Sequence, residues 1–129
     1  MLVYNSENSC IIHIEKKMSL YLAIEGYMES LKIKEFAKAL VEFCLTKKIK
    51  HIFFDTSKIS VVKHEDLFWV TENVFPKLQD SEIEKVAFLL PAKSFGYMAV
   101  KILADRIEKK QNKVFARLEE AEKWLYGSI

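Results

Sequence analysis

An acid, two hydroxyls and a lysine follow one another at Asp55, Thr56, Ser57 and Lys58. Such groups can hold a polar ligand such as a nucleotide, or act as a phosphorylation switch. They end the mainly apolar run Ile49–Asp55, which predicts a parallel strand, and ligands of open α/β sheets bind beyond the carboxyl ends of such strands. We therefore predict a ligand site at residues 55–58. The alternative is that Asp55 and Ser57 only satisfy backbone amides where the chain turns.

A second polar pair, Lys93 and Ser94, follows the next predicted strand and opens a predicted helix. Backbone amides at a helix N-terminus can bind an anion, so these two residues join the candidate ligand site. A simpler alternative is that Ser94 is the N-cap of the helix. The chain has only three glycines and neither of the glycine-rich nucleotide-binding motifs, so we expect no cofactor.

Metal and nucleophile chemistry find little support in the sequence. The histidines, His13, His51 and His64, are scattered, and no pair of cysteines has the spacing of a metal site. Cys10 and Cys44 lie among apolar residues, which predicts two buried free thiols. His64 could meet Asp55 across a loop as an acid/base pair, although it is equally an ordinary residue in the first turn of a helix. We expect no metal and no catalysis.

The hydrophobic pattern of the first half predicts strands and one helix. Alternation over Cys10–Glu25 predicts a hairpin, with Leu2–Tyr4 as a short edge strand. From Ser30, a plausible N-cap, apolar residues recur every three or four positions, which predicts an amphipathic helix. The consecutive apolar residues of Ile49–Asp55 then predict a central strand covered on both faces.

Strands and helices alternate through the second half. The predicted elements are a helix over His64–Leu78, a strand over Lys85–Leu90, a helix over Ser94–Lys109, a strand over Lys113–Ala116 and a helix over Leu118–Tyr126 that Gly127 ends. A hairpin followed by strict alternation predicts an α/β fold whose mixed sheet has right-handed crossovers. With 129 residues, no internal repeat and no linker, we expect a single domain over residues 1–129.

Trp69 stands out within the predicted helix His64–Leu78. The apolar stripe of that helix consists of Leu67, Val70, Thr71, Val74 and Leu78. Trp69 falls on the opposite side, beside Glu65, Glu72 and Asn73. Because tryptophan is enriched at binding hot spots, we predict that these four residues form an interface with a protein partner or a second copy of the chain. The alternative is that Trp69 packs beneath a neighbouring segment.

The composition limits the classes of partner. Half of the residues are hydrophobic, and the formal net charge is only +2 although 29% of residues are charged, so no disorder and no general nucleic-acid surface are expected. No basic leader and no apolar run of the ~18 residues that a membrane span needs is visible. We therefore expect a cytoplasmic protein.

The order of elements, with FFDTSKIS after one strand, VAFLLPAKSF after the next and VFARLEEAEKWL near the end, resembles the STAS-type domains. More closely, it is similar to the STAS/SEC14-like, anti-anti-sigma-factor-like bacterial proteins. In regulatory members of that family a serine at the start of the next helix is phosphorylated, whereas this chain has Lys63, His64, Glu65 and Asp66 there. The resemblance implies a non-enzymatic module that binds a protein or a small apolar ligand. An alternative is a SEC14-like carrier of a lipid, and a hydrolase or transferase at Asp55 is a third.

Overall fold

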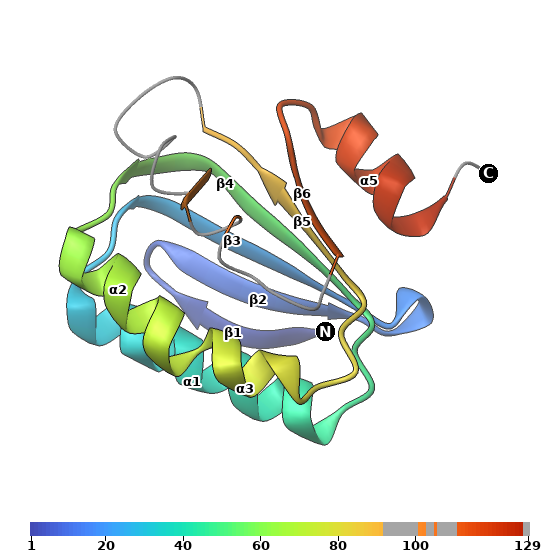
Figure 1. The fold of residues 1–129 in the computed structure, drawn as a ribbon, viewed down its shortest axis with the longest axis horizontal. Coiled ribbons are helices and arrows are strands. Elements are labelled where there is room, and N and C mark those ends of the chain that lie inside the picture. The colour runs from blue at the N-terminus through green and yellow to red at the C-terminus, as the bar shows by residue number, and fades with distance from the viewer. Residues whose placement is uncertain (92–100, 103–104, 106–110, 128–129) are drawn as a thin grey trace.

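The computed structural model describes residues 1–91, 101–102, 105 and 111–127. A six-stranded mixed sheet with the strand order β1-β2-β3-β4-β5-β6 forms the centre of the fold (Figure 1). β1 to β3 are antiparallel, and β3 to β6 are parallel. The prediction of an α/β fold with a mixed sheet is therefore confirmed. The strands are β1 (Leu2–Ser6), β2 (Ser9–Ile14), β3 (Ser19–Tyr27), β4 (His51–Val61), β5 (Lys85–Leu89) and β6 (Gln111–Phe115).

Helices cover both faces of this sheet (Figure 1). α1 (Ser30–Thr46), α2 (His64–Asn73) and α3 (Phe75–Gln79) lie on one face, and α5 (Leu118–Tyr126) lies on the other. Successive residues of a strand point to opposite faces. Ile52 and Phe54 of β4 accordingly join the core beneath α1, while Phe53 joins the core beneath α5. The prediction that this strand is central and covered on both faces is confirmed.

The N-terminal strands form the predicted hairpin and edge strand, with a 3-10 turn at Glu15–Lys17 between β2 and β3. The register places Ile11, which is fully buried, toward α1. Cys44 is buried as expected, but Cys10 is only half-buried, so that part of the prediction is wrong. Cys10 pairs with Ala23 on the face of the sheet that carries Phe53, and the described helix on that face, α5, packs mainly on β4 to β6.

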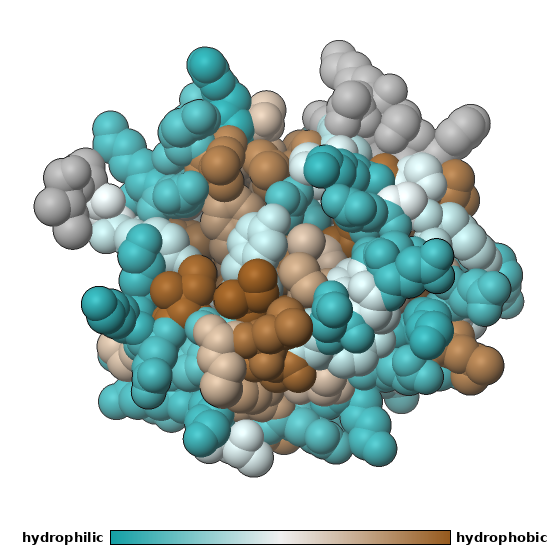
Figure 2. All heavy atoms as spheres, turned by 180° about the vertical axis from the view of Figure 1, so that it is seen from behind, coloured by the Kyte–Doolittle hydropathy of each residue, from teal (hydrophilic) through white to brown (hydrophobic). Residues whose placement is uncertain are grey.

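Among the described residues, part of the sheet surface over β1 and β2 therefore lies outside the two helix-covered cores, while Tyr21 of β3 packs at the edge of the core beneath α5. Leu2, Ile12 and Tyr21 stand opposite one another across these strands, and Leu2 is exposed. Seen from behind, hydrophobic side chains gather in a surface patch that hydrophilic side chains surround (Figure 2). The molecule therefore brings apolar groups together at its surface as well as in its interior.

Helix boundaries follow the sequence signals with two corrections. α5 has the predicted bounds, and Gly127 ends it with a φ of +82°, a value that favours glycine. The N-cap of α1 is Glu29 rather than Ser30, which is the first helical residue. The predicted helix His64–Leu78 is divided into α2 and α3, because Pro76 in the first turn of α3 has no amide hydrogen to continue the hydrogen bonds of α2.

The remaining elements lie close to their predicted positions. β5 ends one residue earlier than predicted, and β6 spans Gln111–Phe115 rather than Lys113–Ala116. Residues 101–102 and 105 of the predicted helix Ser94–Lys109 are helical. Lys93 and Ser94 lie outside the described residues, so their role in binding an anion stays a prediction.

Candidate functional site

The sequence predicted that residues 55–58 follow the end of a strand. In the structure they lie within β4. β4 continues to Val61, although its pairing with β5 ends where Asp55 meets Leu89. Along β3 the register shifts, since Ala23 pairs with Asp55 but Glu25, two residues on, pairs with Lys58. The extra residue in β4 is a β-bulge, which takes a backbone group out of the regular ladder.

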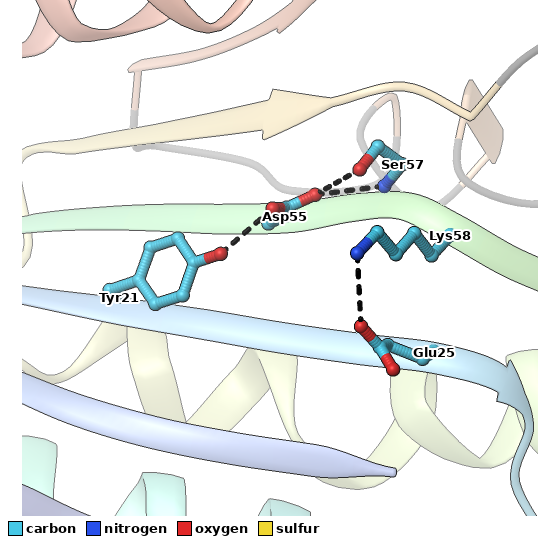
Figure 3. A network of polar contacts seen from close by, with 5 residues as sticks. All are labelled: Tyr21, Glu25, Asp55, Ser57 and Lys58. Carbon is cyan, nitrogen blue, oxygen red and sulfur yellow. Dashed lines mark hydrogen bonds and ion pairs between the residues drawn. The ribbon is translucent and has the colours of Figure 1, made fainter.

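Asp55 satisfies the groups that this bulge leaves free (Figure 3). The backbone amide of Ser57 donates a hydrogen bond to the Asp55 Oδ1 at 3.0 Å, and the Ser57 hydroxyl donates to the same oxygen at 2.6 Å. The Tyr21 hydroxyl donates to Oδ2 at 2.8 Å from the neighbouring strand β3. A carboxylate with three donors is well satisfied, so the alternative from the sequence, that Asp55 and Ser57 satisfy backbone amides, describes much of this arrangement.

Thr56 points to the other face of the sheet and is 1% exposed. Its hydroxyl donates to the Leu89 carbonyl at 2.6 Å, which satisfies an acceptor at the point where β4 and β5 separate. A buried hydroxyl with this partner cannot contact a ligand in solvent. The prediction that Thr56 belongs to a ligand site stays a prediction, and Thr56 is among the residues that line an apolar cavity on this face of the sheet.

Lys58 and His64 are both directed to solvent. The Lys58 Nζ lies 3.4 Å from the Glu25 Oε1, and both side chains are largely exposed (Figure 3). His64 is exposed at the first residue of α2. Among the described residues no hydrogen bond joins it to Asp55, so the acid/base pair considered from the sequence does not form in this structure.

Two acidic groups near Asp55 stay protonated. The pKa of the Tyr21 hydroxyl is raised well above its ordinary value, first by burial and then by its hydrogen bond to Asp55. The pKa of the Cys10 thiol is raised by burial and by the negative charge of Glu25. A thiol rather than a thiolate is a weak nucleophile, and a protonated tyrosine remains a donor. We name the hydrogen-bonded group of Tyr21, Asp55 and Ser57 the Asp55 network. It stabilises the bulge and can orient a polar group beside it.

A feature that sequence reasoning missed lies on the opposite face of the sheet. Two apolar cavities of about 70 and 80 Å³ lie between the α1–α3 layer and the strands. Phe54 and Val70 line both, so the two spaces adjoin. Together they have about the volume, roughly 150 Å³, of an engineered apolar cavity that takes up benzene. Their walls are mostly apolar side chains, with Gln79 in the first cavity and Thr56 in the second.

Gln79 is the one polar side chain among the described residues that line the first cavity. The Gln79 Oε1 is buried and has no hydrogen-bond partner within the described ranges of the chain. Leaving a buried polar atom unpaired costs about 1–3 kcal/mol, so such atoms are rare and each calls for an explanation, such as a bound water, ion or ligand. An isolated glutamine at the end of a helix carries no signal in the sequence that would reveal this position.

The predicted interface on α2 has a different geometry from the one expected. Trp69 is half-buried, because it packs against the cluster of Ala37, Val41 and Val74 between α1 and α2. The expectation of an exposed tryptophan is therefore wrong. Glu65, Glu72 and Asn73 are exposed, and the Asn73 amide donates to the Trp69 carbonyl at 2.9 Å. The exposed aromatic residue of α2 is Phe68, with 60% of its surface accessible.

Comparison with models of known protein families finds no match, and searches of curated proteins and of solved structures find none either. Within the described ranges, no helix has the length and apolar character needed to cross a membrane. In the same part of the chain, no three His, Cys, Asp or Glu side chains are grouped so that they could hold a metal ion.

Proposed function

We propose that this chain is a non-enzymatic, STAS-like binding module that holds a small apolar molecule between its α1–α3 layer and its sheet. The observation that carries the proposal is the pair of adjoining apolar cavities, the first of which is lined by Gln79, whose Oε1 is buried and has no partner among the described residues. Ligand sites in proteins are mostly apolar, with a few polar groups that fix the orientation of the ligand. The cavities have this composition, and the order of strands and helices agrees with the resemblance to STAS domains.

The lining also defines the chemical class of ligand. Among the described lining residues the polar side chains are Gln79 in the first cavity and Thr56 in the second, and the Thr56 hydroxyl already donates to the Leu89 carbonyl. Such a wall fits a molecule that is largely hydrocarbon and carries a single hydrogen-bond donor, such as a hydroxyl group. A filled site removes the cost of the unpaired Gln79 oxygen and adds dispersion contacts to side chains that lack neighbours. The Asp55 network lies on the other face of the sheet and plays no part in this binding.

A SEC14-like lipid carrier remains the alternative, and a specific observation bears on it. The two cavities extend along the same layer and meet at Phe54 and Val70, which is the arrangement that a longer apolar chain would occupy. Sites for larger ligands measure about 300–1,000 Å³, so a lipid would require α2 to move away from the sheet. The small ligand needs no such movement, and we favour it.

Native mass spectrometry of the purified protein, followed by thermal melts with p-cresol and toluene, tests the proposal. These two probes differ only by a hydroxyl, so the hydrogen bond to Gln79 should make p-cresol bind more tightly by ~1 kcal/mol, a roughly fivefold lower Kd. In Gln79→Leu the preference for p-cresol should disappear while toluene still binds. If neither probe raises the melting temperature and no small molecule accompanies the purified protein, the proposed function is wrong.

A further inference from the structure

A groove lies on the outer side of the helix layer and is lined by residues of α1, α2 and α3. Its volume is about 430 Å³. Ala37, Val41 and Val74 form its floor and are buried, and the half-buried ring of Trp69 forms one wall. The tryptophan is fixed by its packing against this floor, so it presents an apolar surface whose conformational entropy is already reduced. Such aromatic groups are typical anchors of protein interfaces.

The rim of this groove is basic, so we name it the basic groove. Lys34 and Lys38 line it from α1, Lys77 lines it from α3, and Glu42 is the single acidic residue in the lining. Within the described part of the chain none of the three lysines forms an ion pair, whereas Lys32, on the exposed side of α1, pairs with Glu35. The Lys34 Nζ lies 5.6 Å from the centre of the Trp69 ring. Three positive charges and one negative charge therefore surround an apolar floor, which leaves the rim with a net positive charge.

We infer that the basic groove docks an acidic helical segment of another protein. Lys34 and Lys38 are four residues apart on α1, which places them about one helical turn, or ~6 Å, apart along the groove. An amphipathic helix with carboxylates at the same spacing can contact both lysines while it lays an apolar side chain against Trp69. Lys77 on the opposite rim then contacts a carboxylate on the other side of that helix.

The lining favours a protein segment over a small anion. Small anions are usually held by backbone amides at helix N-termini or in glycine-rich loops. The basic groove is instead lined by side chains from the middle of α1, from the last turns of α2 and from α3. Flexible lysines spread along an elongated apolar floor match an elongated acidic partner. The docking site adds to the proposed function and does not depend on it, because the ligand cavity lies on the inner side of the same helices.

The probe is a fluorescein-labelled helical peptide of about four turns, with glutamate at every i and i+4 position of one face and leucine on the other. Fluorescence anisotropy measures its binding to the full chain. Lys38→Glu combined with Lys77→Glu should weaken binding at least about tenfold, because two attractive contacts become repulsive. The matched control, Lys47→Glu combined with Lys48→Glu, makes the same change of net charge on exposed residues just beyond α1, outside the groove, and should leave the affinity within about twofold.

A second readout reports directly on the groove. In Trp124→Phe, Trp69 is the only tryptophan, and its emission should shift to shorter wavelength when the peptide covers it. No binding by the wild-type chain, or equal weakening in both double variants, would overturn the inference, since the second result indicates only general charge attraction. Vesicles of phosphatidylserine provide the remaining comparison. If they bind with the same dependence on Lys38 and Lys77 while the peptide does not bind, the groove contacts a membrane surface and the inference is wrong.

Discussion

Phe54 and Phe53 are adjacent in β4 but face different layers, which gives a matched pair of perturbations. The Phe54 ring is stacked between Phe36 and Phe88, with centroid distances of 6.3 and 5.7 Å, and it lines both apolar cavities. The Phe53 ring lies beneath α5, with its centroid 5.8 Å from that of Tyr21. Phe54→Ala therefore enlarges the ligand cavity. Phe53→Ala instead creates a separate cavity on the other face of the sheet.

Both truncations should destabilise the chain by a similar amount. Phe→Ala in a core costs about 3–5 kcal/mol, which for a domain of this size lowers the melting temperature by roughly 10–20 °C. In Phe54→Ala the two cavities merge and gain the space of the missing ring, because Phe54 lines both. The resulting apolar space exceeds the size that takes up benzene. Benzene at several times its Kd should then restore about 1 kcal/mol, or a few degrees, since it binds only the folded state.

Thermal melts by circular dichroism with and without benzene measure this effect. We expect benzene to raise the melting temperature of Phe54→Ala and to change that of Phe53→Ala by much less. Phe54→Leu, which removes less of the ring, serves if the alanine variant is too unstable to study. Equal rescue of both variants, or no rescue of Phe54→Ala, would show that the space around Phe54 is not the binding cavity described above.

Three further predictions concern other parts of the fold. Burial raises the pKa of Cys44 from 9.0 to about 12, so the folded state keeps a proton that the unfolded state loses above pH 9. The free energy of unfolding should therefore fall as the pH rises from 9 toward 12, and it should fall less in Cys44→Ala. A thiol reagent should label Cys10 before the buried Cys44. Thr56→Val should cost about 1–3 kcal/mol in chemical denaturation, because it leaves the Leu89 carbonyl unpaired, and a change below ~0.5 would contradict the hydrogen bond. Trp69→Ala should cost about 2 kcal/mol in the same assay, since the ring is half-buried between two helices, whereas a loss below ~0.5 would indicate a ring without packing partners.

Trp69 illustrates how a helical pattern misplaces a residue. The apolar stripe of Leu67, Val70, Thr71, Val74 and Leu78 predicts one buried side of the helix and places Trp69 opposite it, in solvent. In the structure Val70 and Val74 of the stripe pack in one cluster with Trp69 and residues of α1, so the contact with α1 extends beyond the stripe and covers part of the tryptophan. Phe68 is the opposite example, because it is an apolar residue next to Leu67 of the stripe and yet it is exposed. Periodicity predicts that a helix is amphipathic, but the number of its neighbours depends on the tertiary arrangement.

The Asp55 network shows a similar limit in a strand. Asp, Ser and Lys after an apolar run are typical of a strand end, and the prediction ended the strand at Asp55. The strand instead continues through a bulge, because the Asp55 carboxylate accepts from the Ser57 amide that the register shift frees. The polar residues in the sequence therefore correctly marked the place where the regular strand pairing is interrupted. They could not distinguish a bulge from a turn, since in both cases a short polar side chain satisfies a free backbone amide.

The apolar cavities mark the point beyond which a hydrophobic pattern carries no information. Phe36, Leu40, Ile52 and Phe88 line the first cavity and are also members of the main core, so their positions in the sequence are those of ordinary buried residues. Whether such side chains meet or leave a space depends on the separation of the helix layer from the sheet, which is set by contacts along the whole layer. A filled core and a binding cavity therefore have the same pattern of apolar residues. Only the buried and unpaired oxygen of Gln79 distinguishes them here, and a partner for an unpaired atom can be judged only when its three-dimensional surroundings are known.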